Sequence, residues 1–230
     1  MAKQRVHEDP RMSVNSLAAY LVAPAARRQK IILEQKRPKS FQVAYYDEVE
    51  EAIVGRLSSP NQSTEALDAA LSKLQLSSGL KDWELTRRST GIEAIEAFRS
   101  TNIDTPLEGI DILQAPSRPR HMHVDGVAVS VRPELLLANT NGEKTKARLG
   151  VIKIYLSKKP LTEERARYTG TILYKHVEAQ YSSLGTADHR LCFVLDVFAK
   201  RIFSAPQSYK RRQEDVEAAC KEIALAWPLI

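Results

Sequence analysis

The chain has 230 residues, of which 43% are hydrophobic and 27% are charged, a composition typical of a globular protein that buries a substantial core. Its two cysteines provide no disulfide framework, no run approaches roughly 18 consecutive apolar residues, and no apolar stretch follows the first basic residues. A disulfide-stapled scaffold, a membrane span and a secretory leader are therefore not expected, and we predict a cytoplasmic protein.

The net charge of +6 is concentrated in two basic clusters. The first cluster comprises Arg27, Arg28, Lys30, Lys36, Arg37 and Lys39, and the second comprises Lys210, Arg211 and Arg212. Residues 47–68 are, in contrast, mainly acidic. Clustered lysine and arginine side chains bind phosphates, so we predict a nucleic-acid partner. An ordinary solvated helix face explains the first cluster equally well, and a protein partner or a homo-oligomer stays open.

The first half of the sequence is predicted to be helical. Residues 1–12 are polar and aperiodic, so disorder is expected there. From residue 13 to residue 102, apolar residues recur at helical spacing. The predicted helices cover residues 16–22, 24–37, 43–57, about 65–76, and 90–99. Asn15 and Ser16 are expected to cap the first of these helices, and Pro24 to begin the second.

Residues 103–230 are predicted to form an α/β core that is integrated with the helical region in one domain. Strands are predicted near 110–112 and at 124–131, 149–156 and 190–198, and helices at about 162–179 and 208–226. The last strand is almost continuously apolar, as expected for a strand covered on both faces. Residues 115–121 are expected to form a loop and Asn139–Gly142 a turn. A hairpin, a crossover helix and a covered strand imply a mixed sheet flanked by helices.

Four polar side chains follow one another through this core. Glu134 follows Arg-Pro at the end of one predicted strand, and Lys153 lies in the middle of the next. Glu164 and Tyr168 come on the following helix at positions i and i+4, so one helix face presents both side chains.

This order resembles the PD-(D/E)XK nuclease superfamily, and within it the RecB-like branch. In that family an acid at a strand end and an acid-x-Lys pair on the next strand hold Mg²⁺ beside the scissile phosphate. The RecB-like branch adds Gln-x-x-x-Tyr on the next helix. The segment SVNSLAAYLVAPAARRQ also resembles the first helical segment of such proteins, and the resemblance covers most of 13–40 and 125–180. It implies a restriction-endonuclease-like fold and a metal-dependent nuclease acting on DNA or RNA.

The resemblance also assigns roles to residues of this chain. Glu134 and Glu164 would hold Mg²⁺ or Mn²⁺, and Lys153 would assist the attacking water. Tyr168 would orient the site. The two basic clusters would grip the phosphates of the nucleic acid.

Two positions depart from the family pattern. Val151 occupies the position of the acid in acid-x-Lys, and Glu164 replaces the glutamine of the RecB-like motif. Glu164 could supply the second metal-binding acid from the helix. Alternatively, the protein keeps the fold without the chemistry and serves as a nucleic-acid-binding or protein-binding subunit.

Structural explanations compete with these roles. Glu134 could be a solvated strand-end acid, and Glu164 a surface acid favoured by the helix dipole. Tyr168 could be a core residue with its hydroxyl at the edge. Lys153 is harder to explain in this way, because an unpaired lysine in a central strand costs several kcal/mol.

Two further features compete for a functional assignment. Asp196 lies in an otherwise apolar strand, where pairing with a basic residue or with backbone donors is expected rather than a site role. The string His121-x-His123-x-Asp125 has the spacing of some zinc ligands, but the adjacent histidine of the metallo-β-lactamase-like pattern is absent. A polar strand end explains this string more simply.

Overall fold

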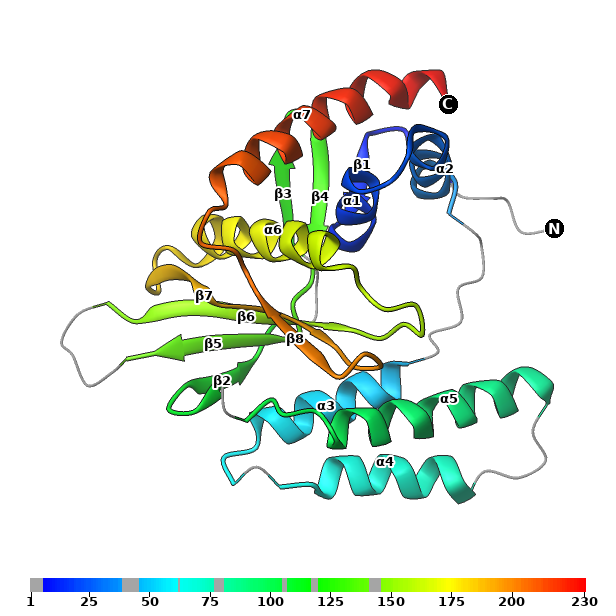
Figure 1. Cartoon of the computed structure of the whole chain (residues 1–230), viewed down its shortest axis with the longest axis vertical. Coiled ribbons are helices and arrows are strands. Elements are labelled where there is room, and N and C mark those ends of the chain that lie inside the picture. Colours follow the sequence, from blue (N-terminus) through cyan, green and yellow to red (C-terminus); the bar gives the residue numbers. More distant parts are fainter. Residues whose placement is uncertain are drawn as a thin grey trace.

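A five-stranded mixed sheet separates two helical layers (Figure 1). The computed structural model describes residues 6–38, 46–61, 63–76, 81–104, 107–116, 120–140 and 146–230. In sheet order, the strands are β2 (Asp111–Gln114), β5 (Leu135–Asn139), β6 (Arg148–Tyr155), β7 (Thr186–Asp196) and β8 (Arg201–Ser204). Strands β2, β5 and β6 form an antiparallel meander. Helix α6 (Glu163–Tyr181) then crosses over to β7, which is parallel to β6, and β8 returns antiparallel.

Alternating side chains give this sheet two apolar faces. One face packs on α3 (Asp47–Ser58), α4 (Glu65–Leu76) and α5 (Asp82–Arg99). The residues that the strands contribute to this cluster are Leu135, Leu137, Ile152, Ile154, Phe193 and Leu195. In Figure 1 these three helices form the layer below the sheet.

The opposite face carries α6 and a second, smaller sheet. This sheet has the order β1 (Arg11–Ser13), β4 (Val127–Val131) and β3 (Arg120–Val124), with β1 parallel and β3 antiparallel to β4. Helices α1 (Val14–Leu21), α2 (Ala25–Lys36) and α7 (Lys210–Ala226) complete the layer, and the short 3-10 helix η2 (Trp227–Leu229) follows α7. The inward valines of β4 are fully buried in the cluster that also holds Val151 and Leu173.

Local sequence explains several element boundaries. The Ser13 hydroxyl accepts a hydrogen bond from the Ser16 N–H at 3.1 Å and caps α1. Asp125 and Gly126 both have positive φ, 42° and 83°, which suits the two-residue turn between β3 and β4. The Thr162 hydroxyl caps α6 by accepting from the Arg165 N–H at 3.3 Å.

Bonds from α2 and η2 join parts of the chain that are far apart in sequence. The indole N–H of Trp227 donates to the carbonyl of His7 at 3.1 Å. The ammonium of Lys36 donates to the carbonyl of Trp227 at 2.7 Å, and Arg37 donates to the carbonyl of Ile230 at 3.2 Å. These bonds close the layer above the sheet.

The α/β class and most of the predicted helices are confirmed. The helical first half does not form one unit, however, because α1 and α2 pack above the sheet and α3, α4 and α5 pack below it. No helix in the described part of the chain combines the length and apolarity that a bilayer crossing requires.

Several sequence predictions need correction. Ser13, and not Asn15 or Ser16, caps the first helix. Residues 11–13 form β1, with Met12 buried, where disorder was expected up to residue 12; residues 1–5 lie outside the described residues. Helix α5 begins at Asp82, well before residue 90. Strands β3, β5 and β8 were not predicted, and part of the predicted turn Asn139–Gly142 lies outside the described residues.

One buried histidine in the upper layer lacks hydrogen-bond partners. His176 on α6 is fully buried, and among the described residues neither of its ring nitrogens has a partner. Its ring packs edge-on against Tyr181, with the centroids 5.9 Å apart. Burial, with a smaller effect from Arg120, lowers the pKa of His176 from 6.5 to about 4.

This lowered pKa predicts acid sensitivity. Folding favours the neutral imidazole, so its stabilisation is complete above pH 6.5 and is lost as the pH falls towards 4. Between pH 7 and pH 4, the unfolding free energy of His176→Leu should fall by up to about 3 kcal/mol less than that of the wild type, because the variant has no imidazole to protonate. Urea unfolding at both pH values measures this difference. The exposed His121 provides the control variant, His121→Gln. The same pH dependence in wild type and His176→Leu would contradict the assignment.

Candidate functional site

Glu134 and Lys153 meet on adjacent strands of the five-stranded sheet. Glu134 immediately precedes β5, and its N–H donates to the carbonyl of Ile152 at 3.0 Å. This register places it opposite Lys153 in β6. One carboxylate oxygen of Glu134 accepts from the Lys153 ammonium, and the other accepts from the N–H of Ile154. The predicted proximity of Glu134 and Lys153 is thus present. Glu134 lies in the connection between the end of β4 at Val131 and the start of β5 at Leu135, so it follows a strand as predicted and also leads into the next one.

The pair is almost closed to solvent. The Glu134 side chain is 2% exposed and the Lys153 side chain 10% exposed. Burial raises the pKa of Glu134 above its usual range, and the Lys153 ammonium opposes that shift. Repulsion from Glu50 on α3 adds to the rise. The Glu50 carboxylate itself accepts from Arg132 at 2.8 Å.

Val151 is fully buried in the position where the family pattern has its second acid. It lies between Leu136 of β5 and Cys192 of β7 in the sheet register. Its side chain belongs to the apolar cluster beneath α6. The sheet therefore offers a single carboxylate beside Lys153 on these strands, with both oxygens engaged.

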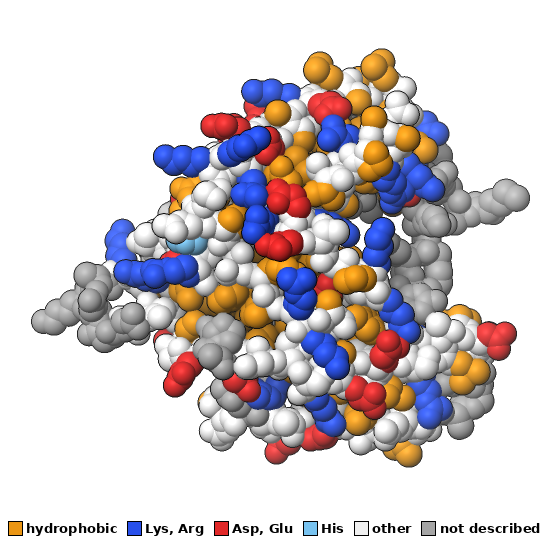
Figure 2. Space-filling model, in the orientation of Figure 1, with side chains coloured by type: hydrophobic (Ala, Val, Ile, Leu, Met, Phe, Trp, Pro, Cys, Tyr) orange, Lys and Arg blue, Asp and Glu red, His pale blue; other side chains and the backbone are white. Residues whose placement is uncertain are grey.

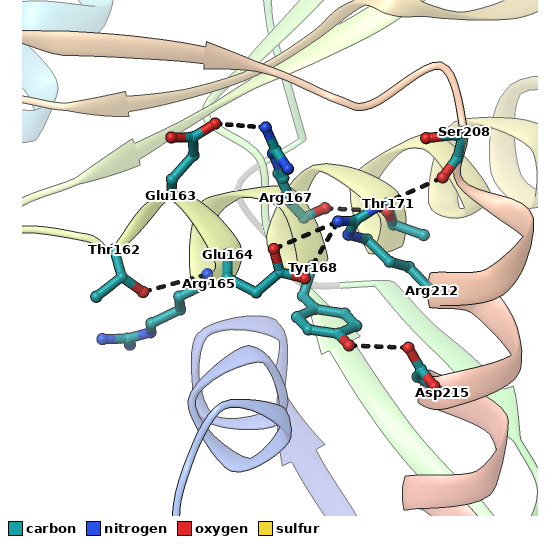
Figure 3. A network of polar contacts seen from close by, with 10 residues as sticks. All are labelled: Thr162, Glu163, Glu164, Arg165, Arg167, Tyr168, Thr171, Ser208, Arg212 and Asp215. Carbon is teal, nitrogen blue, oxygen red and sulfur yellow. Dashed lines mark hydrogen bonds and ion pairs between the residues drawn. The ribbon is translucent and has the colours of Figure 1, made fainter.

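Glu164 and Tyr168 belong to a different cluster, between the first turns of α6 and α7 (Figure 3). The Glu164 carboxylate accepts from the Arg212 guanidinium at 3.2 Å, and Arg212 lies 5.9 Å from the centre of the Tyr168 ring. The Tyr168 hydroxyl donates to Asp215 at 2.9 Å. Burial and this hydrogen bond raise the pKa of Tyr168 to about 12, so the hydroxyl is a donor at neutral pH. None of the bonds among the described residues links this cluster to Glu134 or Lys153.

Most basic residues of α2 are engaged within the protein. Arg27 forms an ion pair with Glu34 at 3.0 Å, and Arg28 donates to the carbonyl of Ala23 at 3.0 Å. Lys36 and Arg37 hold the carbonyls of Trp227 and Ile230, as described above. Lys30 is exposed, and Lys39 lies outside the described residues.

The second basic cluster opens α7. Lys210 and Arg211 are exposed, Arg212 is half-buried, and the first turn of α7 contains no acidic residue. On the face shown in Figure 2, basic and acidic side chains lie close together over α6 and the beginning of α7.

The two remaining sequence candidates have simple environments. Asp196 is fully buried and accepts from the N–H groups of Leu161 at 2.7 Å and Ala199 at 3.2 Å, so its backbone-donor explanation is confirmed. His121 and His123 are exposed on the edge strand β3. Within the described ranges, no group of three or more His, Cys, Asp or Glu residues is arranged to hold a metal ion.

Sequence reasoning missed Glu50, Arg132, Arg167 and Asp215. Arg132 had a signal, because it lies two residues before Glu134, and Asp215 lies one helical turn after Arg211. Glu50 is one of several acids in the 47–68 segment, and nothing in its local sequence separates it from the others.

No protein-family model matches the chain, and no curated protein matches it significantly.

The buried pair predicts a large stability effect. Lys153→Met leaves a buried carboxylate without its counter-charge, so the unfolding free energy should fall by about 3–5 kcal/mol. Adding Glu134→Gln should restore part of this loss, because a neutral amide oxygen still accepts from Ile154. Urea unfolding of the two single variants and the double variant measures the coupling.

The matched control is Lys158→Met, which breaks an exposed ion pair with Glu93. Its effect should stay below about 1 kcal/mol. If Lys153→Met and Lys158→Met lower the unfolding free energy equally, the buried Glu134–Lys153 pair stabilises the protein no more than an exposed ion pair does.

Proposed function

We propose that this protein is a nuclease-fold module that binds nucleic acid without cleaving it. The observation that carries the proposal is the state of Glu134: both of its oxygens are engaged, its side chain is 2% exposed, and Val151 stands where a second acid is expected. Under this proposal, the acid and the lysine of the PD-(D/E)XK-like pattern, Glu134 and Lys153, form a buried ion pair instead of a metal site.

The sheet supports the fold assignment within this proposal. The meander β2-β5-β6, the α6 crossover and the parallel strand β7 form the mixed, helix-flanked sheet that a restriction-endonuclease-like fold implies. The meeting of Glu134 and Lys153 on neighbouring strands, as the resemblance implies, adds support.

The side chains do not fit Mg²⁺ or Mn²⁺ at the predicted site. Such ions need several oxygen ligands with free lone pairs. Both oxygens of Glu134 already accept hydrogen bonds and its side chain is 2% exposed, Val151 has no donor atom, and Glu164 pairs with Arg212 in another cluster. The Lys153 ammonium donates to Glu134 and its side chain is only 10% exposed, so little solvent reaches it.

The basic surface supports the binding half of the proposal. Lys210 and Arg211 are exposed at the beginning of α7, where the helix dipole adds partial positive charge. Phosphate binding by such a surface needs no metal ion, and it is strongly salt-dependent because counterions are released.

A metal-dependent nuclease stays the second candidate, because Glu50 lies close enough to Glu134 to raise its pKa. That assignment would require the Arg132–Glu50 and Lys153–Glu134 pairs to open and the two carboxylates to share a cation. Glu50, rather than Glu164, would be the second acid.

Binding and cleavage assays separate the two candidates. We expect labelled DNA and RNA 20-mers to bind with an affinity that falls steeply with salt, that persists in EDTA, and that Mg²⁺ or Mn²⁺ does not strengthen, measured by fluorescence anisotropy. We expect no cleavage products on plasmid or single-stranded substrates. Cleavage by the wild type that is lost in Glu134→Gln, with circular dichroism showing that this variant stays folded, would establish the nuclease instead.

Restoring the missing acid tests the origin of the site. Val151→Glu places a second carboxylate in the buried cluster beside Lys153, so the melting temperature should drop. We expect Mn²⁺ to raise the melting temperature of this variant but not of the wild type, because binding to the folded state alone stabilises it. Val129→Glu, at a buried position of β4 in the smaller sheet, is the control. Equal Mn²⁺ responses of the two variants would contradict a residual metal-binding geometry.

A further inference from the structure

Two adjoining hollows form a groove between the beginnings of α6 and α7. One hollow, of about 460 Å³, is lined by residues that include Glu164, Tyr168 and Arg211. The other, of about 430 Å³, is lined by residues that include Arg167 and Phe203. Arg212 and Ser208 line both hollows. We call this feature the α6–α7 groove.

The groove is lined by three arginines and three carboxylates, Arg167, Arg211, Arg212, Glu163, Glu164 and Asp215, and its basic residues cluster at the beginning of α7. Anionic side chains are normally favoured at a helix N-terminus and cationic ones are disfavoured there. Helix α7 has the reverse, with Lys210, Arg211 and Arg212 in its first turn and no acid. Basic residues in the first turn destabilise α7 through the helix dipole, and a bound anion would offset that destabilisation.

Arg212 is held by Glu164 and Ser208. One terminal nitrogen donates to both oxygens of Glu164, at 3.2 and 3.3 Å, and the other donates, at a long 3.4 Å, to the carbonyl of Ser208 (Figure 3). Among the described residues its Nε–H has no acceptor, but this atom is buried, so an external ligand would reach only the terminal nitrogens. A phosphate could replace Glu164 there, because its oxygens match the guanidinium geometry.

The first turn of α6 supplies carboxylates that occupy the arginines of the groove. Glu164 pairs with Arg212, and its side chain is 48% exposed. The preceding residue, Glu163, pairs with Arg167 at 2.5 Å, and these side chains are 59% and 45% exposed. The Glu163–Arg167 pair is exposed and therefore weak. The Arg212 side chain is only 17% exposed, so displacing Glu164 from it requires a ligand that replaces the lost ion pair, as a phosphate would.

The basic residues of α2 lie too far from the α6–α7 groove to contact the same phosphate. Arg28 pairs with Glu222 near the end of α7, whereas the groove lies at its beginning. The helix is 17 residues long, which corresponds to roughly 25 Å. The two basic clusters therefore lie at opposite ends of α7, and most of the α2 cluster is tied to internal partners.

We infer that the α6–α7 groove binds the phosphate backbone of a nucleic acid and that Glu164 competes with the phosphate for Arg212. The inference rests on the nucleic-acid binding proposed above and assigns it a site. Glu164 is thus a built-in competitor that sets the threshold of binding, and not a metal ligand.

The test is anisotropy titration of fluorescein-labelled single-stranded and duplex DNA 20-mers with the full chain. Arg211→Gln and Arg212→Gln should each weaken binding about fivefold and lower the slope of log K against log salt by about 1. Glu164→Gln should tighten binding about two- to fivefold, because Arg212 is released. Circular dichroism melts show that each variant is folded.

The controls are Arg27→Gln and Glu34→Gln, which break an arginine–carboxylate pair on α2 whose side chains are 46% and 45% exposed, against 17% and 48% for Arg212 and Glu164. Both should leave binding within about twofold of wild type, since they lie away from the groove. If Glu164→Gln and Glu34→Gln tighten binding equally, or if Arg27→Gln weakens it as much as Arg211→Gln, the groove is not the site although the protein binds DNA. If the wild type binds neither probe, the proposed function and this inference both fail.

Discussion

A carboxylate and an ammonium that lie under apolar helices must neutralise each other, and Glu134 and Lys153 meet this requirement across two neighbouring strands. The pair joins the residue that precedes β5 to the middle of β6, and the second oxygen of Glu134 accepts from the backbone N–H of Ile154. Opening this pair would expose two charges to a low-dielectric interior. Because Glu134 is paired with Lys153 inside the sheet, it is not available as a free carboxylate for a cation.

Away from this buried pair, a second set of charged side chains lies above the sheet. The crossover helix that places β7 beside β6 also presents Glu164 and Tyr168 to α7. The position of these side chains is thus set by the topology of the sheet, although they take no part in its core. The layer below the sheet, formed by α3, α4 and α5, contributes apolar cover and Glu50 near the buried pair.

Sequence patterns predicted those features that depend on local periodicity. The β-branched strand around Lys153 and the covered strand around Asp196 were both found. Glu134 and Lys153 do meet, but through β5, which was not predicted, because the predicted strand before Glu134 is β4 and belongs to the other sheet. Strand β5 was missed because its LLLAN residues lack alternation, and β3 because histidines and an arginine dominate it. The partner of Glu164 could not be predicted, because Arg212 lies 48 positions away on a helix whose docking is set by tertiary packing.

The bonds of Trp227, Lys36 and Arg37 have a consequence for how the polypeptide reaches its native state. The hydrogen bond from Trp227 to His7 spans 220 positions, and the upper layer includes residues from both sides of that span. A nascent chain on the ribosome cannot close this layer until residue 227 has emerged. The lower three-helix layer, made of sequence neighbours, can form earlier, so biosynthesis should leave the underside of the growing sheet covered while its other face still awaits α7.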